Sequence, residues 1–422
     1  MTTTNSIPFF ELKFDKDARL TEVAELEAIE SALQSGNYTD ILFISHGWNN
    51  DMTEARELYD SLLQLVHDEI VDHPIKDRSF ISIGIFWPSK KFSHNHQKDG
   101  SAAALNNRSN AANTIELCHE LDQFINTPNA SVALKNIIDC IDKKSPEPIE
   151  LATQFIDLYH AISLNENGAM DEEALKYYDI ENMTRILEDP DFLETGDLPE
   201  PGMGGATSIF NGTINGINNL LNMATYYQMK ERAGLIGVQG LNPILKRIKL
   251  KCNGKIHLAG HSFGARLMSA AVSGSTAVSP IQVQSLSLMQ AAFSHYGFAE
   301  KYEKNFDGLF RNTIAKKYVA GPIIITHTRN DKAVGIAYAI ASRLANQVAS
   351  AVGDKDDFYG GLGSNGAQKT PEANNGLLLD MDGNYSFTAG GVYNLKADKY
   401  IKDHSDIKKP QVAKALVAAM ST

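Results

Sequence analysis

The residues best suited to chemistry form a Gly-x-Ser-x-Gly motif centred on Ser262. The motif follows a short apolar run at 255–259 and precedes a helical pattern at 265–272. A serine in a sharp turn between a strand and a helix projects its hydroxyl above the end of a sheet, where a base can reach it. Gly260 and Gly264 let the strand and the helix approach closely because neither has a Cβ. The motif therefore predicts Ser262 as a nucleophile; the alternative is an ordinary turn in which Ser262 caps the helix.

A nucleophilic serine needs a base within hydrogen-bonding reach, and the base needs an acid that fixes its tautomer. In sheets with this motif the partners follow in the chain order serine, acid, histidine. Asp331 comes after the apolar run at 323–326, where the acid is expected, although the same position suits a helix N-cap. His404 satisfies the order, whereas His327 precedes the acid. We therefore expect Ser262, Asp331 and His404 to form a catalytic triad; the alternative for His404 is a surface-loop histidine without a role.

Negative charge that develops on a substrate oxygen requires backbone N–H donors. One donor is expected from Phe263, the residue after the nucleophile. The second is expected from the turn His46-Gly47-Trp48, which follows the apolar run at 41–44, and Trp48 is favoured over Gly47. His46 is then a residue that positions this turn. Chain order disfavours the alternative, in which His46 is the catalytic histidine of another mechanism.

Apolar runs and helical patterns alternate in the N-terminal and C-terminal parts of the chain. This alternation predicts an α/β protein with a mostly parallel central sheet and helices on both faces. Strands are expected at 9–15, 41–45, 80–87, 255–259, 283–289, 323–326 and 393–395. Helices are expected at 21–34, 53–71, 209–233, 241–250, 334–350 and 410–420, and a loop at 353–376.

The alternation of strand and helix patterns stops over residues 93–205, where helical patterns dominate and strand patterns are missing. This block ends in a stretch rich in glycine and proline. We therefore expect one sheet-based core, residues 1–92 and 206–422, interrupted by a helical cap or lid at 93–205. The alternative is a helical decoration remote from the site.

Composition narrows the classes of partner. The chain of 422 residues has a formal net charge of −12, which disfavours nucleic acid or an anionic membrane surface as the main partner. Three cysteines without paired spacing predict neither a disulfide framework nor a metal site. Neither a signal-peptide pattern nor a run of about 18 apolar residues is present. We expect a cytoplasmic protein without stable membrane insertion; signal-independent export stays open, and the oligomeric state is unknown.

Several motifs together resemble those of the α/β-hydrolase superfamily, and within it bacterial serine esterases and lipase-like proteins. The similar stretches are Phe43–Trp48, Trp87–Ser89, Met229–Gly234, Gly260–Arg266, Thr328–Asp331 and His404–Ile407. The resemblance implies the α/β-hydrolase fold, triad roles for Ser262, Asp331 and His404, and an oxyanion hole shaped by the turn at 46–48.

Motif and resemblance together predict hydrolysis of a carboxylic ester, small or lipid, through an acyl-serine intermediate, with no metal or organic cofactor. The fold alone does not choose between esterase, thioesterase, peptidase and acyltransferase. Two other classes stay open. One is an effector or toxin of phospholipase type that attacks membrane lipid. The other is a non-catalytic binding module on a hydrolase scaffold, with the helical block as its interaction surface.

Overall fold

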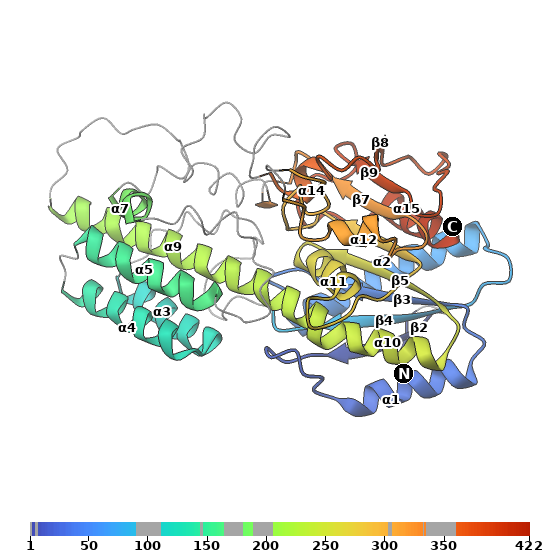
Figure 1. Cartoon of the computed structure of the whole chain (residues 1–422), viewed down its shortest axis with the longest axis horizontal. Helices are drawn as coiled ribbons and strands as arrows, with labels where there is room; N and C mark the ends of the chain where they lie inside the picture. Colours follow the sequence, from blue (N-terminus) through green and yellow to red (C-terminus); the bar gives the residue numbers. More distant parts are fainter. Residues whose placement is uncertain are drawn as a thin grey trace. The chain divides into compact units, whose positions relative to one another are not determined.

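The protein divides into two compact units. The computed structural model describes residues 2–4, 7–89, 111–143, 147–163, 180–188, 206–302, 306–331, 333–334 and 360–422. The first unit comprises Met1–Lys91, Arg232–Gly335 and Gly360–Thr422, and the second comprises Phe92–Glu231 and Ile336–Tyr359. The first unit contains a central sheet, and the described part of the second is helical (Figure 1).

The sheet of the first unit has nine strands in the order β1-β2-β4-β3-β5-β6-β7-β9-β8. Strand β1 is antiparallel to β2, and the other neighbouring pairs are parallel. The strands are β1 (Thr2–Thr4), β2 (Ile7–Lys13), β3 (Asp40–Ser45), β4 (Phe80–Phe86), β5 (Lys255–His261), β6 (Ser285–Met289), β7 (Ile323–His327), β8 (Ala373–Leu377) and β9 (Val392–Lys396). The predicted α/β class with a mostly parallel sheet is confirmed.

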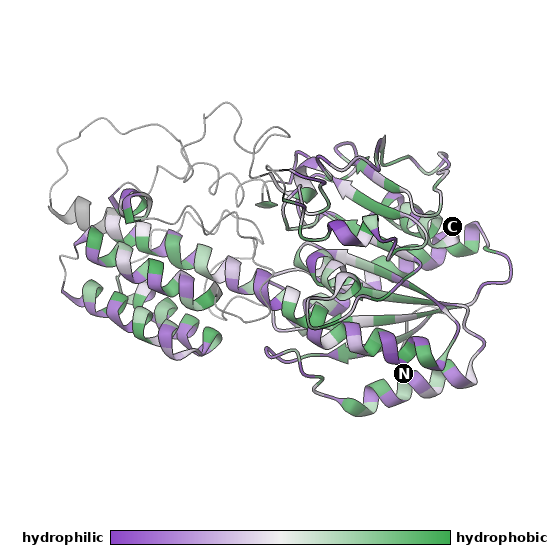
Figure 2. Ribbon diagram, viewed as in Figure 1, coloured by the Kyte–Doolittle hydropathy of each residue, from purple (hydrophilic) through white to green (hydrophobic). Residues whose placement is uncertain are grey.

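Helices cover both faces of this sheet, as its buried strands require. The described α-helices of the first unit include α1 (Val23–Ser35), α2 (Met52–Asp72), α10 (Asn242–Lys251), α11 (Phe263–Ser273), α12 (Arg311–Ala315), α14 (Leu362–Asn365) and α15 (Pro410–Ser421). Helices α2 and α15 share an apolar cluster with one face, while α1, α10 and α11 lie over the other (Figure 1). Hydrophobic and hydrophilic residues alternate along these helices in Figure 2, as expected for helices with one buried side.

The strand order places a change in the direction of the connections where the site is expected. After β3 the chain continues to β4 on one side of β3, whereas β5, β6 and β7 follow one another on the other side. Connections therefore leave in opposite directions from the carboxyl ends of β3 and β5. Ligands of open parallel sheets bind at such a switch point. The loop after β3 carries the turn at 46–48, and the loop after β5 carries Ser262.

Two parts of the fold differ from expectation. The segment 353–376 is not all loop, because it contains α14 and β8. Strand β8 has the sequence Ala-Asn-Asn-Gly-Leu and is largely exposed at the sheet edge, so no apolar pattern marks it. Strand β1 was likewise not predicted. Of the predicted helix at 334–350, all but residue 334 lies outside the described residues.

The second unit is a bundle of helices around its own apolar core. Its described helices are α3 (Ala111–Ile125), α4 (Pro128–Asp142), α5 (Pro148–Ser163), α7 (Ile180–Glu188) and α9 (Ala206–Leu235). Residues 206–231 of α9 were expected in the sheet-based core, but buried side chains such as Ile217 and Leu220 pack with the bundle. The boundary therefore falls within α9. That the bundle caps the strand ends stays a prediction.

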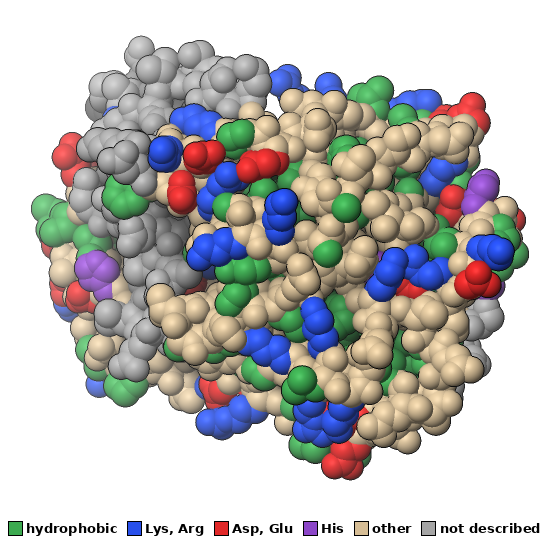
Figure 3. Space-filling model, turned by 45° about the vertical axis from the view of Figure 1, so that its right-hand side comes forward, with side chains coloured by type: hydrophobic (Ala, Val, Ile, Leu, Met, Phe, Trp, Pro, Cys, Tyr) green, Lys and Arg blue, Asp and Glu red, His purple; other side chains and the backbone are tan. Residues whose placement is uncertain are grey.

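Surface features of the described residues add two observations. No helix among them is long and apolar enough to cross a membrane. On the face drawn in Figure 3, Lys and Arg side chains lie in small separate groups, several of them beside Asp or Glu.

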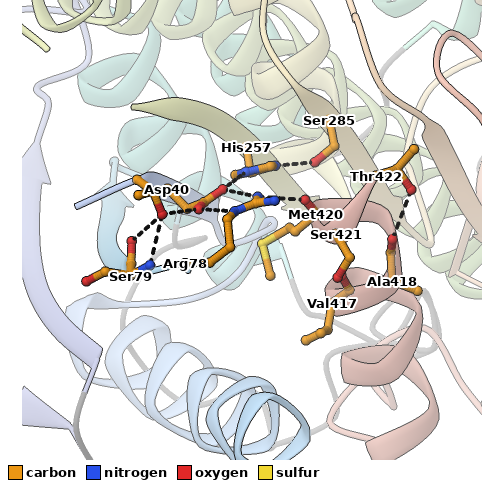
Figure 4. A network of polar contacts seen from close by, with 11 residues as sticks. Asp40, Arg78, Ser79, His257, Ser285, Val417, Ala418, Met420, Ser421 and Thr422 are labelled. Carbon is orange, nitrogen blue, oxygen red and sulfur yellow. Dashed lines mark hydrogen bonds and ion pairs between the residues drawn. The ribbon is translucent and has the colours of Figure 1, made fainter. Parts of the chain in front are cut away.

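A polar network lies near the amino ends of the central strands (Figure 4). The expected site is at the other, carboxyl ends of these strands. Asp40, the first residue of β3, is paired with Nε and Nη2 of Arg78, and its Oδ1 lies 2.7 Å from Nε2 of His257. His257 Nδ1 lies 2.8 Å from Oγ of Ser285, at the start of β6. Arg78 also donates to the carbonyl oxygen of Met420 in α15, at 2.9 Å. The network therefore connects three parallel strands with the C-terminal helix.

Candidate active site

Ser262 occupies the sharp turn that the motif predicts. Strand β5 ends at His261 and α11 begins at Phe263, so Ser262 alone connects them. Its φ of 56° and ψ of −123° are unfavourable for a residue with a Cβ, and such strain is concentrated at functional sites. Its N–H donates to the carbonyl oxygen of Met289 at the end of β6, at 3.0 Å. This hydrogen bond therefore helps to hold Ser262 in its strained conformation.

The two glycines of the motif are needed for close packing, as predicted. A Cβ on Gly260 would clash with the backbone of Gly264, and a Cβ on Gly264 would clash with the carbonyl oxygens of Ser45 and His46. Strand β5, helix α11 and the end of β3 therefore approach closely only because both residues lack a side chain.

The hydroxyl of Ser262 does not cap α11, because no hydrogen bond from a side chain caps this helix. Instead, Ser262 Oγ lies 2.8 Å from Nε2 of His404. His404 comes from the loop between β9 and α15, 142 residues further along the chain. The structure thus joins the predicted nucleophile and the predicted base, and the capping alternative for Ser262 is wrong.

Asp331 makes both kinds of contact that its position in the sequence suggested, one with the predicted base and one with the start of a helix. Its Oδ2 lies 2.8 Å from Nδ1 of His404, and its Oδ1 accepts from the N–H of Val334 at 3.0 Å. The carboxylate is buried, with 1% of the residue exposed. Because an ionised carboxylate only accepts, Nδ1 of His404 carries the proton, and Nε2 is left to accept the proton of Ser262.

The loops that carry Asp331 and His404 are connected by hydrogen bonds from a residue that sequence reasoning missed. Asn330 donates from Nδ2 to the carbonyl oxygens of Asp398, at 3.1 Å, and Ile401, at 2.8 Å. Both acceptors belong to the segment that leads to His404. Its position beside Asp331 was the only signal in the sequence, and it did not reveal which carbonyls the amide reaches.

The turn at 46–48 lies against Ser262, as the predicted oxyanion loop requires. A Cβ built on Gly47 would lie 2.5 Å from Cβ and 3.1 Å from Oγ of Ser262. The rings of Trp48 and Phe263 are neighbours, with centroids 6.2 Å apart. The amide of Phe263 belongs to the first turn of α11, where the helix dipole favours negative charge. Both predicted donor segments therefore flank Ser262.

His46 supports this turn through both of its ring nitrogens. Nδ1 lies 2.9 Å from the carbonyl oxygen of Gly47, and Nε2 accepts from the N–H of Trp87 at 3.3 Å. The imidazole stacks on the Trp87 ring, with centroids 5.4 Å apart. Burial lowers the pKa of His46 to about 4, although the bond to Gly47 opposes this shift. A neutral ring with both nitrogens engaged fits the expected positioning role.

At the carboxyl edge of a mostly parallel sheet, the first unit therefore holds a serine, a histidine and an aspartate in hydrogen-bonded series. Comparisons of the chain with protein-family models, curated proteins and solved structures found no match. The geometry of this site, together with the motifs, is what supports a function.

Proposed function

We propose that this protein is a serine hydrolase with an α/β-hydrolase fold that cleaves carboxylic esters through an acyl-serine intermediate. One observation carries the proposal: Ser262, His404 and Asp331 are joined by two contacts of 2.8 Å, with the serine held in a strained turn between β5 and α11. The motifs that resemble serine esterases and lipase-like proteins support the same chemistry.

In the proposed reaction, His404 Nε2 takes the proton from Ser262 as Oγ attacks the ester carbonyl. The amides of Phe263 and of Trp48 or Gly47 stabilise the oxyanion. His404 then returns the proton to the leaving alcohol. A water molecule, activated by the same imidazole, hydrolyses the acyl-serine. Asp331 stays ionised throughout and stabilises the imidazolium.

Labelling with a fluorophosphonate probe tests this proposal. The wild-type protein should gain the mass of one adduct, because an activated serine attacks the probe's phosphorus, and Ser262→Ala should gain none. Ser269→Ala is the matched control, since this buried serine of α11 only donates to the carbonyl oxygen of Ala265, at 2.9 Å. Intact mass spectrometry reads both results. A folded wild-type protein that takes up no probe would overturn the proposal and favour the binding module.

Two substrates distinguish the forms of the activity. A plain esterase should hydrolyse soluble short-chain esters, whereas a phospholipase-type effector should release fatty acid from phospholipid liposomes. Either activity must disappear in Ser262→Ala.

Gly47→Ala tests the proposed oxyanion loop. The new methyl group would lie 2.5 Å from Cβ of Ser262, so the turn must move away from the nucleophile. Displacing a donor in this way is expected to lower kcat about 100-fold, with a smaller change in KM. Gly376→Ala is the matched control, because a Cβ there would have no neighbour closer than 3.9 Å. Steady-state ester hydrolysis gives both constants, and wild-type kcat in Gly47→Ala would refute the assignment.

A further inference from the structure

His261 directly precedes the nucleophile and contacts the main chain of the base. Its Nε2 lies 2.8 Å from the carbonyl oxygen of His404. Since a carbonyl oxygen only accepts, Nε2 carries the hydrogen and donates it. The two imidazole rings are neighbours, with centroids 4.9 Å apart. The residue beside the nucleophile is thus hydrogen-bonded to the residue that must activate it.

This contact restrains the main chain of His404, which the contacts within the triad do not restrain. Asp331 holds the ring through Nδ1, but a bond to the ring does not fix the main chain from which the ring extends. His261 ends β5, a buried strand paired on both sides with β3 and β6. A donor on such a rigid element fixes its acceptor more closely than a donor on a loop.

Burying the imidazole of His261 costs free energy, and a role in packing alone would not require a polar side chain here. The residue is 6% exposed, and within the described part of the chain its Nδ1 has no hydrogen-bond partner. A buried polar atom without a partner is unfavourable, and an apolar side chain would avoid this cost. Burial and the neighbouring His404 lower the pKa of His261 to about 3. His261 is therefore neutral and does not repel the His404 imidazolium that forms during the reaction.

The geometry points to His261 as a positioning residue for the catalytic base: its Nε2–H fixes the His404 carbonyl, and with it the distance between the imidazole and Ser262 Oγ. This inference rests on the proposed function and adds a further participant to it.

Two substitutions of similar size separate the donor from the bulk of the side chain. His261→Gln places an amide N–H near the position of Nε2, whereas His261→Leu fills space without a donor. His261→Leu is expected to lower kcat and the rate of fluorophosphonate labelling about 10- to 100-fold, with KM changed less than about threefold. His261→Gln should recover most of this loss. His261→Asn, whose amide lies nearer the position of Nδ1, should not.

The control is His327→Leu, since His327 ends β7 as His261 ends β5, and its ring faces the carbonyl oxygen of Ser364. This variant should label at close to the wild-type rate. Equal rates in His261→Leu, His261→Gln and the wild type would overturn the inference. So would equal losses in all three His261 variants accompanied by a lower melting temperature, because that pattern indicates a structural role only. Failure of the wild type itself to label would instead count against the proposed function.

Discussion

Replacing His404 by alanine is expected to lower kcat for ester hydrolysis by about 10⁴- to 10⁶-fold, while KM changes by less than about tenfold. The Ser262 hydroxyl then loses the base 2.8 Å from its Oγ, and the leaving alcohol loses its proton donor. Single-turnover hydrolysis measures the loss, and circular dichroism tests that the variant is folded. Activity within about tenfold of wild type would show that another group is the base.

The same series of contacts predicts that the losses do not add. Once Ser262 or His404 is missing, the remaining partners have nothing to activate, so a double alanine variant should be no slower than either single variant. Asp331→Asn should lower kcat about 10⁴-fold, because an amide favours the wrong tautomer of His404. Asp403→Asn is the control, since this exposed carboxylate next to His404 accepts from the N–H of Ser405. Losses that multiply in the double variant would contradict a triad that acts as a unit.

The strands around the site were predictable because burial leaves a pattern in the sequence. Strands β3, β4 and β6 are buried along their whole length, and each reads as a largely apolar run. Strand β8 lacks this signal. It is held at the sheet edge by its backbone pairing with β9, and most of its side chains do not take part in that pairing. Edge strands with exposed side chains are therefore not predicted by hydrophobic periodicity.

The boundary between the units was missed for a related reason. Helix α9 continues without a break past residue 231, so helical periodicity does not change where the chain passes from one unit to the other. The two parts of α9 differ only in the residues that their buried side chains contact. Such long-range contacts cannot be predicted from the local sequence.

At the site, the types and order of residues predicted the three side chains that the structure joins, but they could not predict contacts made through backbone atoms. The rule of serine, acid and histidine selected Ser262, Asp331 and His404 without any knowledge of distance. His261 and Asn330 act on carbonyl oxygens of the base loop, and any residue type supplies a carbonyl. Their acceptors therefore carry no signature in the sequence.

The second serine, histidine and aspartate series, in Figure 4, is expected to stabilise the fold without performing chemistry. Ser285, His257 and Asp40 are each at most 1% exposed, so no substrate reaches the hydroxyl. Asp40 also forms an ion pair with Arg78, so its carboxylate is not free to act on His257 alone. Ser285→Ala should therefore leave the rate of fluorophosphonate labelling within about twofold of wild type, unlike a substitution in the triad.

Asp40→Ala is expected to lower the free energy of unfolding by about 3–5 kcal/mol, because it leaves Arg78 and His257 without the carboxylate they share. The exposed Asp382 is the control, and Asp382→Ala should change this free energy by less than about 0.5 kcal/mol. Urea unfolding followed by circular dichroism at pH 7 measures both. A loss below about 1 kcal/mol for Asp40→Ala would mean that the network contributes little.

The pH dependence gives this prediction a second test. Burial raises the pKa of Asp40, but hydrogen bonds from His257 and Arg78 outweigh burial and lower it to about 2, from 3.8 for an unperturbed aspartate. A group whose pKa falls on folding stabilises the native state above its unfolded pKa. This contribution is therefore complete above about pH 4 and is lost as the pH falls toward 2.

Burial also lowers the pKa of His257, although Asp40 opposes this shift. As the pH drops below 6.5, His257 therefore takes up a proton more readily in the unfolded chain than in the folded protein. Wild-type stability should thus decline with acid, and the difference between wild type and Asp40→Ala should shrink between pH 4 and 2. A difference that stays constant over that interval would show that the Asp40 charge is not what stabilises the network.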